Sequence, residues 1–363
     1  MTDLCDVTIR ESEQLPGRSY DLEAKLDAGR ALDSLGVPLV QAGFPITGET
    51  DRRAVAQLAD ELTADVVAIA RAVDGDVDAA LEANADVIEV FAPLSTRQLE
   101  TTIGTDRETM LDRLRGAVDR AADGGATVHL TIMDAFRTDH EYVLDATDCF
   151  DDVPTIGLAD TVGATSPSGV DEFLEGVVDA GVEPSRLGVH LHDDLGVATA
   201  NALVAARHGV SRIDVSVASL GERAGNPSLE EVAILCDRDG IVDFGLESSQ
   251  LIPRCEAVLD ALGESVDDRK AVLGGDVFEH ESGLHTAAML RDPSTFEPFD
   301  PATYGGERSL VFGAGSGAGA ARALLESAGA DPDDDLIREL LAALEREGPI
   351  GLEDALGLAR DIA

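Results

Sequence analysis

Basic residues are scarce in this sequence of 363 residues. Lysine and arginine number 27 against 71 acidic residues, only two of them are lysines (Lys25 and Lys270), and the formal net charge is −44. Such a surface repels nucleic acid and anionic membranes, so we expect neither as a partner. Apart from the run Asp-Pro-Asp-Asp-Asp at 331–335, the acidic residues are spread along the chain. We interpret them as a halophilic adaptation to a salt-rich solvent rather than as a binding tail.

Cysteines and long apolar runs are also few. The four cysteines show neither a Cys-x-x-Cys pair nor another zinc-like spacing: Cys5, Cys149, Cys236 and Cys255. We therefore expect free thiols in a reducing compartment. No apolar run approaches the roughly 18 residues of a membrane span, and residues 1–10 do not resemble a signal peptide. Together these absences predict a soluble, cytoplasmic protein.

Strand-like and helix-like segments alternate through the first two thirds of the chain. Eight strand-like runs lie at residues 4–10, 37–44, 65–71, 87–93, 127–134, 155–160, 187–193 and 212–219. Amphipathic segments between them include residues 22–35, 106–122, 167–180 and 196–208. A doubly wound open sheet is one alternative, but eight successive strand–helix units favour a closed parallel α/β barrel of the TIM type. Such a barrel takes about 250 residues, which leaves room for an appended domain.

The segment 187–194, Leu-Gly-Val-His-Leu-His-Asp-Asp, carries the clearest chemical pattern. Apolar residues alternate with His190 and His192, which predicts a strand with both imidazoles on one face. Two neutral imidazoles at i and i+2 can chelate a divalent metal. The alternative is one buried, hydrogen-bonded histidine beside one at a strand end. Two acids and a helix start at Gly196 follow the pair, and this context favours the metal site.

Other polar residues also fall at the carboxyl ends of predicted strands. They are Arg10, Glu11, Arg71, Asp134, Asp160 and Thr161. Barrel enzymes build their active sites at this end. In the first strand, a period of two places Asp6, Thr8 and Arg10 on one face, with Glu11 just past the strand end. Glu11 is then a third ligand beside the histidines, and Arg10 can bind an oxyanion or a carboxylate; a structural Arg–Glu pair is the alternative.

An ordered set of motifs over residues 3–285 resembles the pyruvate-carboxylase-like barrel acyltransferases, the isopropylmalate, homocitrate and citramalate synthases. The first strand resembles their Asp-x-Thr-x-Arg-(Asp/Glu)-Gly-Glu-Gln opening, with Ser12 in place of glycine. The remaining motifs are Ala-Gly-Phe-Pro at 42–45, Asp-Thr-Val-Gly at 160–163, His-Leu-His-Asp-Asp-Leu-Gly at 190–196 with Ala-Asn at 200–201, Gly-Glu-Arg-Ala-Gly-Asn at 221–226 with Leu-Glu-Glu at 229–231, and His-Glu-Ser-Gly-Leu-His at 280–285. The resemblance favours the synthases over the related lyases and aldolases.

The resemblance implies roles for individual residues. The metal ligands would be Glu11, His190 and His192, with Asn226 close to the ion, which would be Zn²⁺, Mn²⁺ or Mg²⁺. Arg10 would stabilise enolate charge, and Thr161 would help to bind the α-keto acid. The implied reaction condenses acetyl-CoA with that keto acid: the metal polarises the keto oxygen, and a base removes a methyl proton from the thioester.

The pattern changes after the eighth unit, so we expect a barrel domain over residues 1–270 and a mainly helical C-terminal domain over 271–363. Expected helices lie at residues 245–262, 320–328, 336–347 and 352–362, with a connector at 270–276. The glycine-rich stretch 313–319 precedes one of them. A phosphate cradle is one interpretation, but a tight loop entering the helix is favoured.

The C-terminal domain also carries a predicted acid–base group. By the resemblance, His285 reaches the barrel mouth of a neighbouring subunit. The predicted mouth holds no histidine beyond the two metal ligands, which also points to His285 as the group with a suitable pKa. We therefore expect a homodimer whose sites are completed in trans. A helix-terminus histidine of the small domain is the alternative.

The sequence departs from the family's pattern at four places. Gln41 stands where a glutamate usually precedes Ala-Gly-Phe-Pro, and Met133 replaces a glutamate at the end of the fifth strand. Phe296 replaces a tyrosine that assists the acid–base histidine, although Tyr304 is near, and Lys-His-Ser-Gly is reduced to Ala-Gly-Ser-Gly at 314–317. Methionine cannot orient a water and phenylalanine cannot donate a proton, so these changes bear on rate and substrate choice.

Three kinds of function follow. The leading hypothesis is a homocitrate-type synthase acting on 2-oxoglutarate. It is favoured by the short chain, the Arg10-Glu11 pair, His-Leu-His-Asp-Asp at 190–194 and Ala-Phe-Arg at 135–137. Isopropylmalate or citramalate synthesis comes next. A dicarboxylate substrate needs a second cation, for which Arg71, Arg97 and Arg137 are the candidates. A lyase or aldolase on the same barrel, and a non-catalytic metabolite-binding paralogue, are the alternatives.

Overall fold

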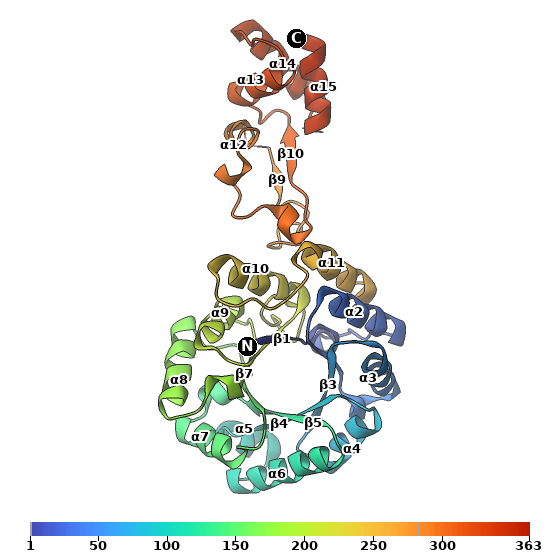
Figure 1. The fold of residues 1–363 in the computed structure, drawn as a ribbon, viewed down its shortest axis with the longest axis vertical. Coiled ribbons are helices and arrows are strands. Elements are labelled where there is room, and N and C mark those ends of the chain that lie inside the picture. The colour runs from blue at the N-terminus through green and yellow to red at the C-terminus, as the bar shows by residue number, and fades with distance from the viewer. Residues whose placement is uncertain (1, 282) are drawn as a thin grey trace. The chain divides into compact units, whose positions relative to one another are not determined.

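The computed structural model describes residues 2–281 and 283–363, which form two compact units. One unit comprises the chain up to Glu247 together with Arg254–Ser265, and the other comprises Ser248–Pro253 with Val266–Ala363. In the first unit, eight parallel strands close in chain order from β1 to β8 (Figure 1). The strands are β1 (Asp3–Asp6), β2 (Leu39–Gly43), β3 (Asp65–Arg71), β4 (Val87–Pro93), β5 (Thr127–Met133), β6 (Thr155–Asp160), β7 (Leu187–Leu191) and β8 (Arg212–Val215). The predicted closed barrel is confirmed over the open sheet.

Helices surround the strands (Figure 1). Those that follow the strands are α2 (Leu22–Leu35), α3 (Glu49–Glu61), α4 (Asp74–Glu82), α6 (Arg107–Asp123), α7 (His140–Cys149), α8 (Pro167–Asp179), α9 (Ala198–His208), α10 (Leu229–Asp239) and α11 (Leu251–Leu262), with short turns at α1 (Thr8–Glu11) and α5 (Thr96–Gln98). Their starts follow local chemistry. Asp21 accepts a hydrogen bond from the backbone nitrogen of Ala24, and Ser166 caps α8 ahead of a proline.

The first predicted strand is wrong in its second half. The strand ends at Asp6, whose carboxylate accepts hydrogen bonds at 2.9 Å from both the backbone nitrogen and the hydroxyl of Thr8. This local hydrogen bonding turns the chain into the helical turn α1. Thr8 and Arg10 therefore do not share a strand face with Asp6. Arg10 and Glu11 instead leave the barrel rim from one helical turn.

A charged layer crosses the barrel interior. Arg212 on β8 is 1% exposed and binds Glu89 on β4 at 2.7 Å, which places both side chains inside the barrel because β4 and β8 lie across from one another. Its Nε also lies 2.9 Å from Asp214. Burial would raise the pKa of Glu89, but Arg212 outweighs it and lowers that pKa to about 2. The interior of the barrel thus contains a layer of ion pairs in addition to its apolar core.

The two lysines have different surroundings. Lys25 on α2 is fully buried, and its Nζ lies 2.5 Å from both Glu13 and Asp51. Asp51 also accepts a hydrogen bond from the backbone nitrogen of Phe44. Lys25 therefore joins α2 to α3 and to the segment after α1. Lys270 is partly exposed and lies in the turns beyond α11.

The second unit contains a small sheet and four helices. Its strands, in the order β11–β10–β9, are β9 (Glu279–His280), β10 (Ser309–Phe312) and β11 (Ile350–Gly351). Its helices are α12 (Gly283–Met289), α13 (Ala318–Ser327), α14 (Asp334–Glu347) and α15 (Leu352–Ile362), which pack around an apolar core. The helices α13, α14 and α15 were expected, whereas α12 and the sheet were not. Part of the acidic run acts locally, since Asp333 caps α14 through the backbone nitrogens of Asp335 and Leu336.

The glycine-rich stretch forms a tight loop between β10 and α13, as the favoured interpretation predicted. Gly283 donates a backbone hydrogen bond to the carbonyl of Gly315 at 3.0 Å, and a Cβ on Gly283 would lie 2.2 Å from the nitrogen of Gly317. The two backbone segments therefore approach too closely for side chains.

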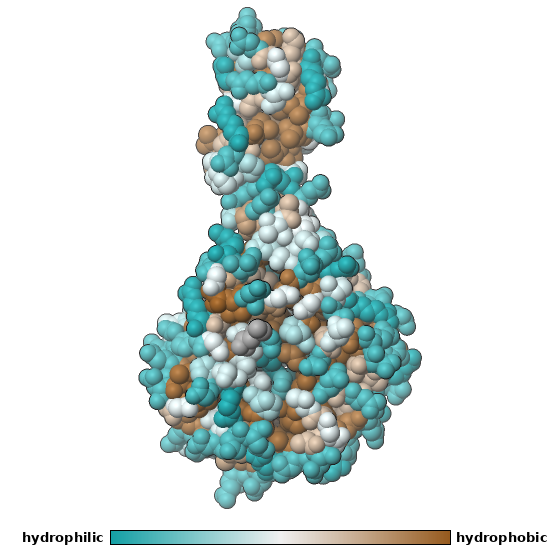
Figure 2. Space-filling view, in the orientation of Figure 1, coloured by the Kyte–Doolittle hydropathy of each residue, from teal (hydrophilic) through white to brown (hydrophobic). Residues whose placement is uncertain are grey.

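The surface and the thiols agree with the composition. On the face shown in Figure 2, hydrophilic residues cover much of the periphery of the barrel unit. All four cysteines are free, as predicted, and only Cys149 is exposed. Within residues 2–281 and 283–363, no helix has the length and apolar character that a bilayer crossing requires.

Candidate active site

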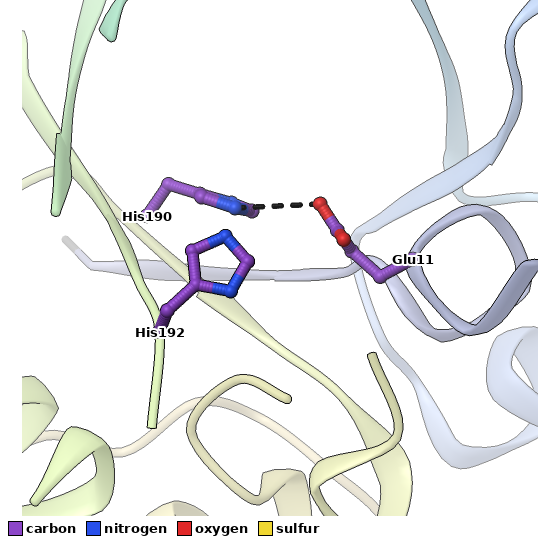
Figure 3. A group of neighbouring side chains, drawn as sticks. All are labelled: Glu11, His190 and His192. Carbon is purple, nitrogen blue, oxygen red and sulfur yellow. Dashed lines mark ion pairs between the residues drawn. The ribbon is translucent and has the colours of Figure 1, made fainter. Parts of the chain in front are cut away.

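Three predicted ligands meet at the mouth of the barrel. Glu11 comes from α1, His190 from the end of β7 and His192 from just beyond it, and their ligand atoms lie within 4.8 Å of one another. Figure 3 shows the side chains converging, with Nε2 of His190 at 3.4 Å from Oε1 of Glu11. The closed barrel brings them together because β1 and β7 both neighbour β8.

The buried polar atoms of this group fit a divalent metal. Nδ1 of His192 and Oε2 of Glu11 are buried without a hydrogen-bond partner among the described residues. Leaving such atoms unsatisfied is costly, and a cation would satisfy them. Two imidazoles and one carboxylate suit Zn²⁺ or Mn²⁺ and also admit Mg²⁺.

A carboxylate missed by the sequence analysis holds His190 in place. Oδ2 of Asp214, on the adjacent strand β8, lies 2.9 Å from Nδ1 of His190, which leaves Nε2 facing Glu11. A carboxylate in this position fixes the orientation of a metal-binding histidine. The alternation of Arg212 and Asp214 in an otherwise apolar strand was a signal that could have marked both as inward-facing.

The two histidines differ in their affinity for protons. Burial would lower the pKa of His190, but its hydrogen bonds with Asp214 and Glu11 outweigh burial and raise that pKa to about 9. Burial and the charge of His190 lower the pKa of His192 to about 3. Burial opposes ionisation of Glu11, yet Arg10 and His190 hold its pKa well below the usual range. His192 and Glu11 are therefore unprotonated at neutral pH, whereas His190 must release a proton to a binding metal.

Arg10 is held between the metal ligands and the charged layer. Its guanidinium forms an ion pair with Glu11, and its Nε donates to Oε1 of Gln41 at 2.6 Å. Nε2 of Gln41 in turn donates to Glu89 at 2.7 Å. Gln41, which departs from the family's glutamate, thus serves as a neutral bridge between a cation and an anion.

Glu11, His190 and His192 line a cavity of about 140 Å³. Its wall contains the predicted site residues Arg10, Glu11, Thr161, His190 and His192. The rest of the wall is Gln14, Gln41, Ile69, Glu89, Phe91, Thr131, Met133, Ala159 and Glu222. The hydroxyl oxygen of Thr161 accepts a hydrogen bond from the backbone nitrogen of Asp134 at 2.8 Å, which leaves its proton free to donate elsewhere.

Asn226 lies beside the ligands but not in the cavity wall. It is fully buried, and its Nδ2 donates at 3.0 Å to the carbonyl of Leu191, between the two histidines. Its Oδ1 has no hydrogen-bond partner in the described part of the chain. Asn226 therefore braces the histidine segment, and ligation by it stays a prediction.

Two predicted substrate-binding residues do not reach this cavity. Arg71 pairs with Asp76 at 2.6 Å, and Arg137 pairs with Asp134 at the same distance. Arg137 and Arg97 line a different cavity, of about 250 Å³. The carboxylates of Asp76 and Asp134 thus hold Arg71 and Arg137 outside the cavity wall. The positions of the two arginines at strand ends did not reveal these ion pairs.

His285 belongs to the second unit. It lies on α12 and stacks on Phe296, with ring centroids 3.9 Å apart and an angle of 27° between the rings. Tyr304 is buried against Phe299 instead. Phe296 thus contacts the predicted acid–base histidine as a flat apolar surface, and it offers no hydroxyl.

Comparisons with known proteins agree with this architecture. The family model described as HMGL-like matches residues 2–258. The chain belongs to the HMGL-like family. A second model, the homocitrate synthase post-HMGL domain-like family, matches residues 272–348. The resemblance inferred from the motifs is therefore confirmed.

Curated relatives of this HMGL-like protein carry three different names. A protein named as an (R)-citramalate synthase, from Methanopyrus kandleri, is 38% identical over 98% of this chain and 72% of its own length. A homocitrate synthase from the same organism is 37% identical over 94% of this chain and 87% of its own. A relative named for 2-isopropylmalate synthesis is 34% identical over 95% and 70%. Among solved structures, the HMG-CoA lyase of Bacillus subtilis matches 74% of this chain and 96% of its own, with a TM-score of 0.65 and 19% identity, which shows the fold alone.

Proposed function

We propose that this protein condenses acetyl-CoA with an α-keto acid, using a divalent metal held by Glu11, His190 and His192. The observation that carries the proposal is the buried triad beside Arg10 at the mouth of the barrel. The synthase names of relatives that match nearly the whole chain support it.

The residues of the cavity suit the steps of such a condensation. The bound metal would supply Lewis acidity at the keto oxygen. Arg10 faces the cavity and can bind an anionic oxygen, and Thr161 can donate its proton to the keto acid's carboxylate. A base removes a methyl proton from acetyl-CoA, the resulting carbon attacks the keto carbon, and hydrolysis of the thioester releases CoA and a second carboxylate.

The acceptor has three candidates among the named relatives. 2-Oxoglutarate would give homocitrate, as the sequence analysis favoured, whereas pyruvate and 2-oxoisovalerate would give citramalate and isopropylmalate. The test is release of free thiol from acetyl-CoA with each keto acid and each metal, at low and high KCl because the chain is so acidic. Cleavage of a hydroxyacyl-CoA without added acetyl-CoA would instead indicate a lyase.

We also propose that the protein is a homodimer and that His285 is the acid–base group, acting on the site of the partner subunit. Among the described residues, the cavity wall contains no histidine besides the two predicted ligands, which supports a base supplied from outside the wall. Arg10→Ala and His285→Ala variants should each be inactive, and mixing them should restore part of the activity. Proven heterodimers without any rescue would contradict the proposal.

A further inference from the structure

The cavity has an apolar wall opposite the metal ligands. Ile69, Phe91 and Met133 come from β3, β4 and β5, which lie across the closed barrel from β7, β8 and β1. Ile69 is buried, and the ring of Phe91 packs edge-on against Phe44 with centroids 6.1 Å apart. A keto acid held near these ligands would have room for its side chain on the far side of the cavity, against this wall.

The buried charges around the cavity balance with a single substrate carboxylate. The ion-paired set comprises two cations and three anions: Arg10, Arg212, Glu11, Glu89 and Asp214. A divalent metal makes the set positive by one charge, and one carboxylate then neutralises it. Glu222, the remaining acid in the wall, lies 2.9 Å from Arg223, which also pairs with Asp194 at 2.8 Å, so this group of three adds one negative charge.

A second carboxylate would find no cation among the described wall residues besides Arg10, which is already paired with Glu11. Arg71 and Arg137 are paired with Asp76 and Asp134 outside it. Glu89 in the wall is an anion, already bound by Gln41, Thr131 and Arg212. The distal carboxylate of 2-oxoglutarate would therefore lose its hydration among apolar side chains and near Glu89, without a cation of its own.

We infer that the acceptor is an α-keto acid with a short, uncharged side chain rather than a dicarboxylate. The inference rests on the proposed condensation for the place where the side chain lies. It reverses the preference for 2-oxoglutarate, which depended on the short chain and on motifs that include Arg10-Glu11 and Ala-Phe-Arg at 135–137, where Arg137 pairs with Asp134.

Binding and turnover test the inference separately. Titration calorimetry of the metal-loaded protein with pyruvate, 2-oxobutyrate, 2-oxoisovalerate and 2-oxoglutarate gives affinities without acetyl-CoA, and thiol release gives kcat/KM. We expect the best uncharged acid to exceed 2-oxoglutarate by about 100-fold or more in both measurements. Equal or tighter binding of 2-oxoglutarate overturns the inference, even if condensation is observed. If no keto acid supports thiol release, the proposed reaction fails, while the calorimetric order still decides the acceptor class.

A single added cation supplies a second test. Met133→Arg places a guanidinium in the apolar wall, and Met133→Leu is the matched control that changes shape without charge. We expect Met133→Arg to shift the affinity ratio toward 2-oxoglutarate by about tenfold, and Met133→Leu to leave that ratio unchanged. An unshifted ratio in folded Met133→Arg contradicts the inference. If that variant does not fold, the affinities of the unmodified protein decide.

Discussion

Replacing Asp214 by asparagine isolates the carboxylate that supports His190. Asp214 is fully buried, and its Oδ2 lies 2.9 Å from Nδ1 of His190 while its Oδ1 lies 2.9 Å from Arg212. Asparagine keeps the shape but removes the charge that orients the ring and makes it a stronger ligand. Loss of such a carboxylate typically weakens metal binding 10- to 100-fold, or about 1.4–2.7 kcal/mol.

The assay is competition for Zn²⁺ or Mn²⁺ between the protein and a chelator of known affinity, with the free energy of unfolding measured in parallel. The chain offers a matched control, because Asp171 pairs with His208 at 2.7 Å on the surface, where Asp171 is 62% exposed. Asp171→Asn should leave metal affinity unchanged and alter stability by less than about 0.5 kcal/mol. A folded Asp214→Asn protein with undiminished metal affinity would refute the role of Asp214.

Three further perturbations address the same site. His192→Ala should reduce the bound metal well below that of the unmodified protein by elemental analysis, and unchanged content would mean that His192 is not a ligand. Gln41→Glu places a carboxylate where an amide now donates to Glu89 at 2.7 Å, so it should lower the free energy of unfolding at neutral pH by about 1–3 kcal/mol, and an unchanged urea midpoint would contradict this. Because the pKa of His190 is raised to about 9 from its ordinary 6.5, its stabilisation of the metal-free protein is complete below pH 6.5 and lost as pH rises through about 9. The loss should approach about 3 kcal/mol in melting experiments, and His190→Gln should remove this pH dependence; a slope that persists in the variant would assign it to another group.

Periodicity predicted the barrel well because its strands are buried runs between amphipathic helices. The bounds of β3, β4 and β6 match the predicted ones. The first strand was predicted too long. It ends at Asp6 because Thr8 donates hydrogen bonds to the Asp6 carboxylate, and this local turn spans only three residues, too few to change the apparent period of two. The sheet of the second unit was missed because β9 and β11 have two residues each, too few for alternation to appear.

Site residues could be predicted from the sequence only where their order along the chain shows that they lie close together in space. His190 and His192 are close in sequence, and Glu11 could be added because the ends of parallel strands converge. Asp214 was missed because its role depends on the register between β7 and β8. The ion pair of Arg71 with Asp76 was not foreseen, because a position at a strand end says nothing of a carboxylate five residues later.

The different surroundings of the two lysines allow chemical labelling at one lysine side chain and not at the other. Lys25 is enclosed by Glu13 and Asp51 with no exposed surface, so a succinimidyl ester cannot reach its amine. Lys270, which is partly exposed, is then the lysine side chain that the reagent can reach. Such esters also acylate the α-amine of a polypeptide, so with that amine blocked a fluorophore or spin label on Lys270 would mark each chain once, without any introduced cysteine. In a dimer, two such labels would report a single distance between subunits, and in a monomer they would report none.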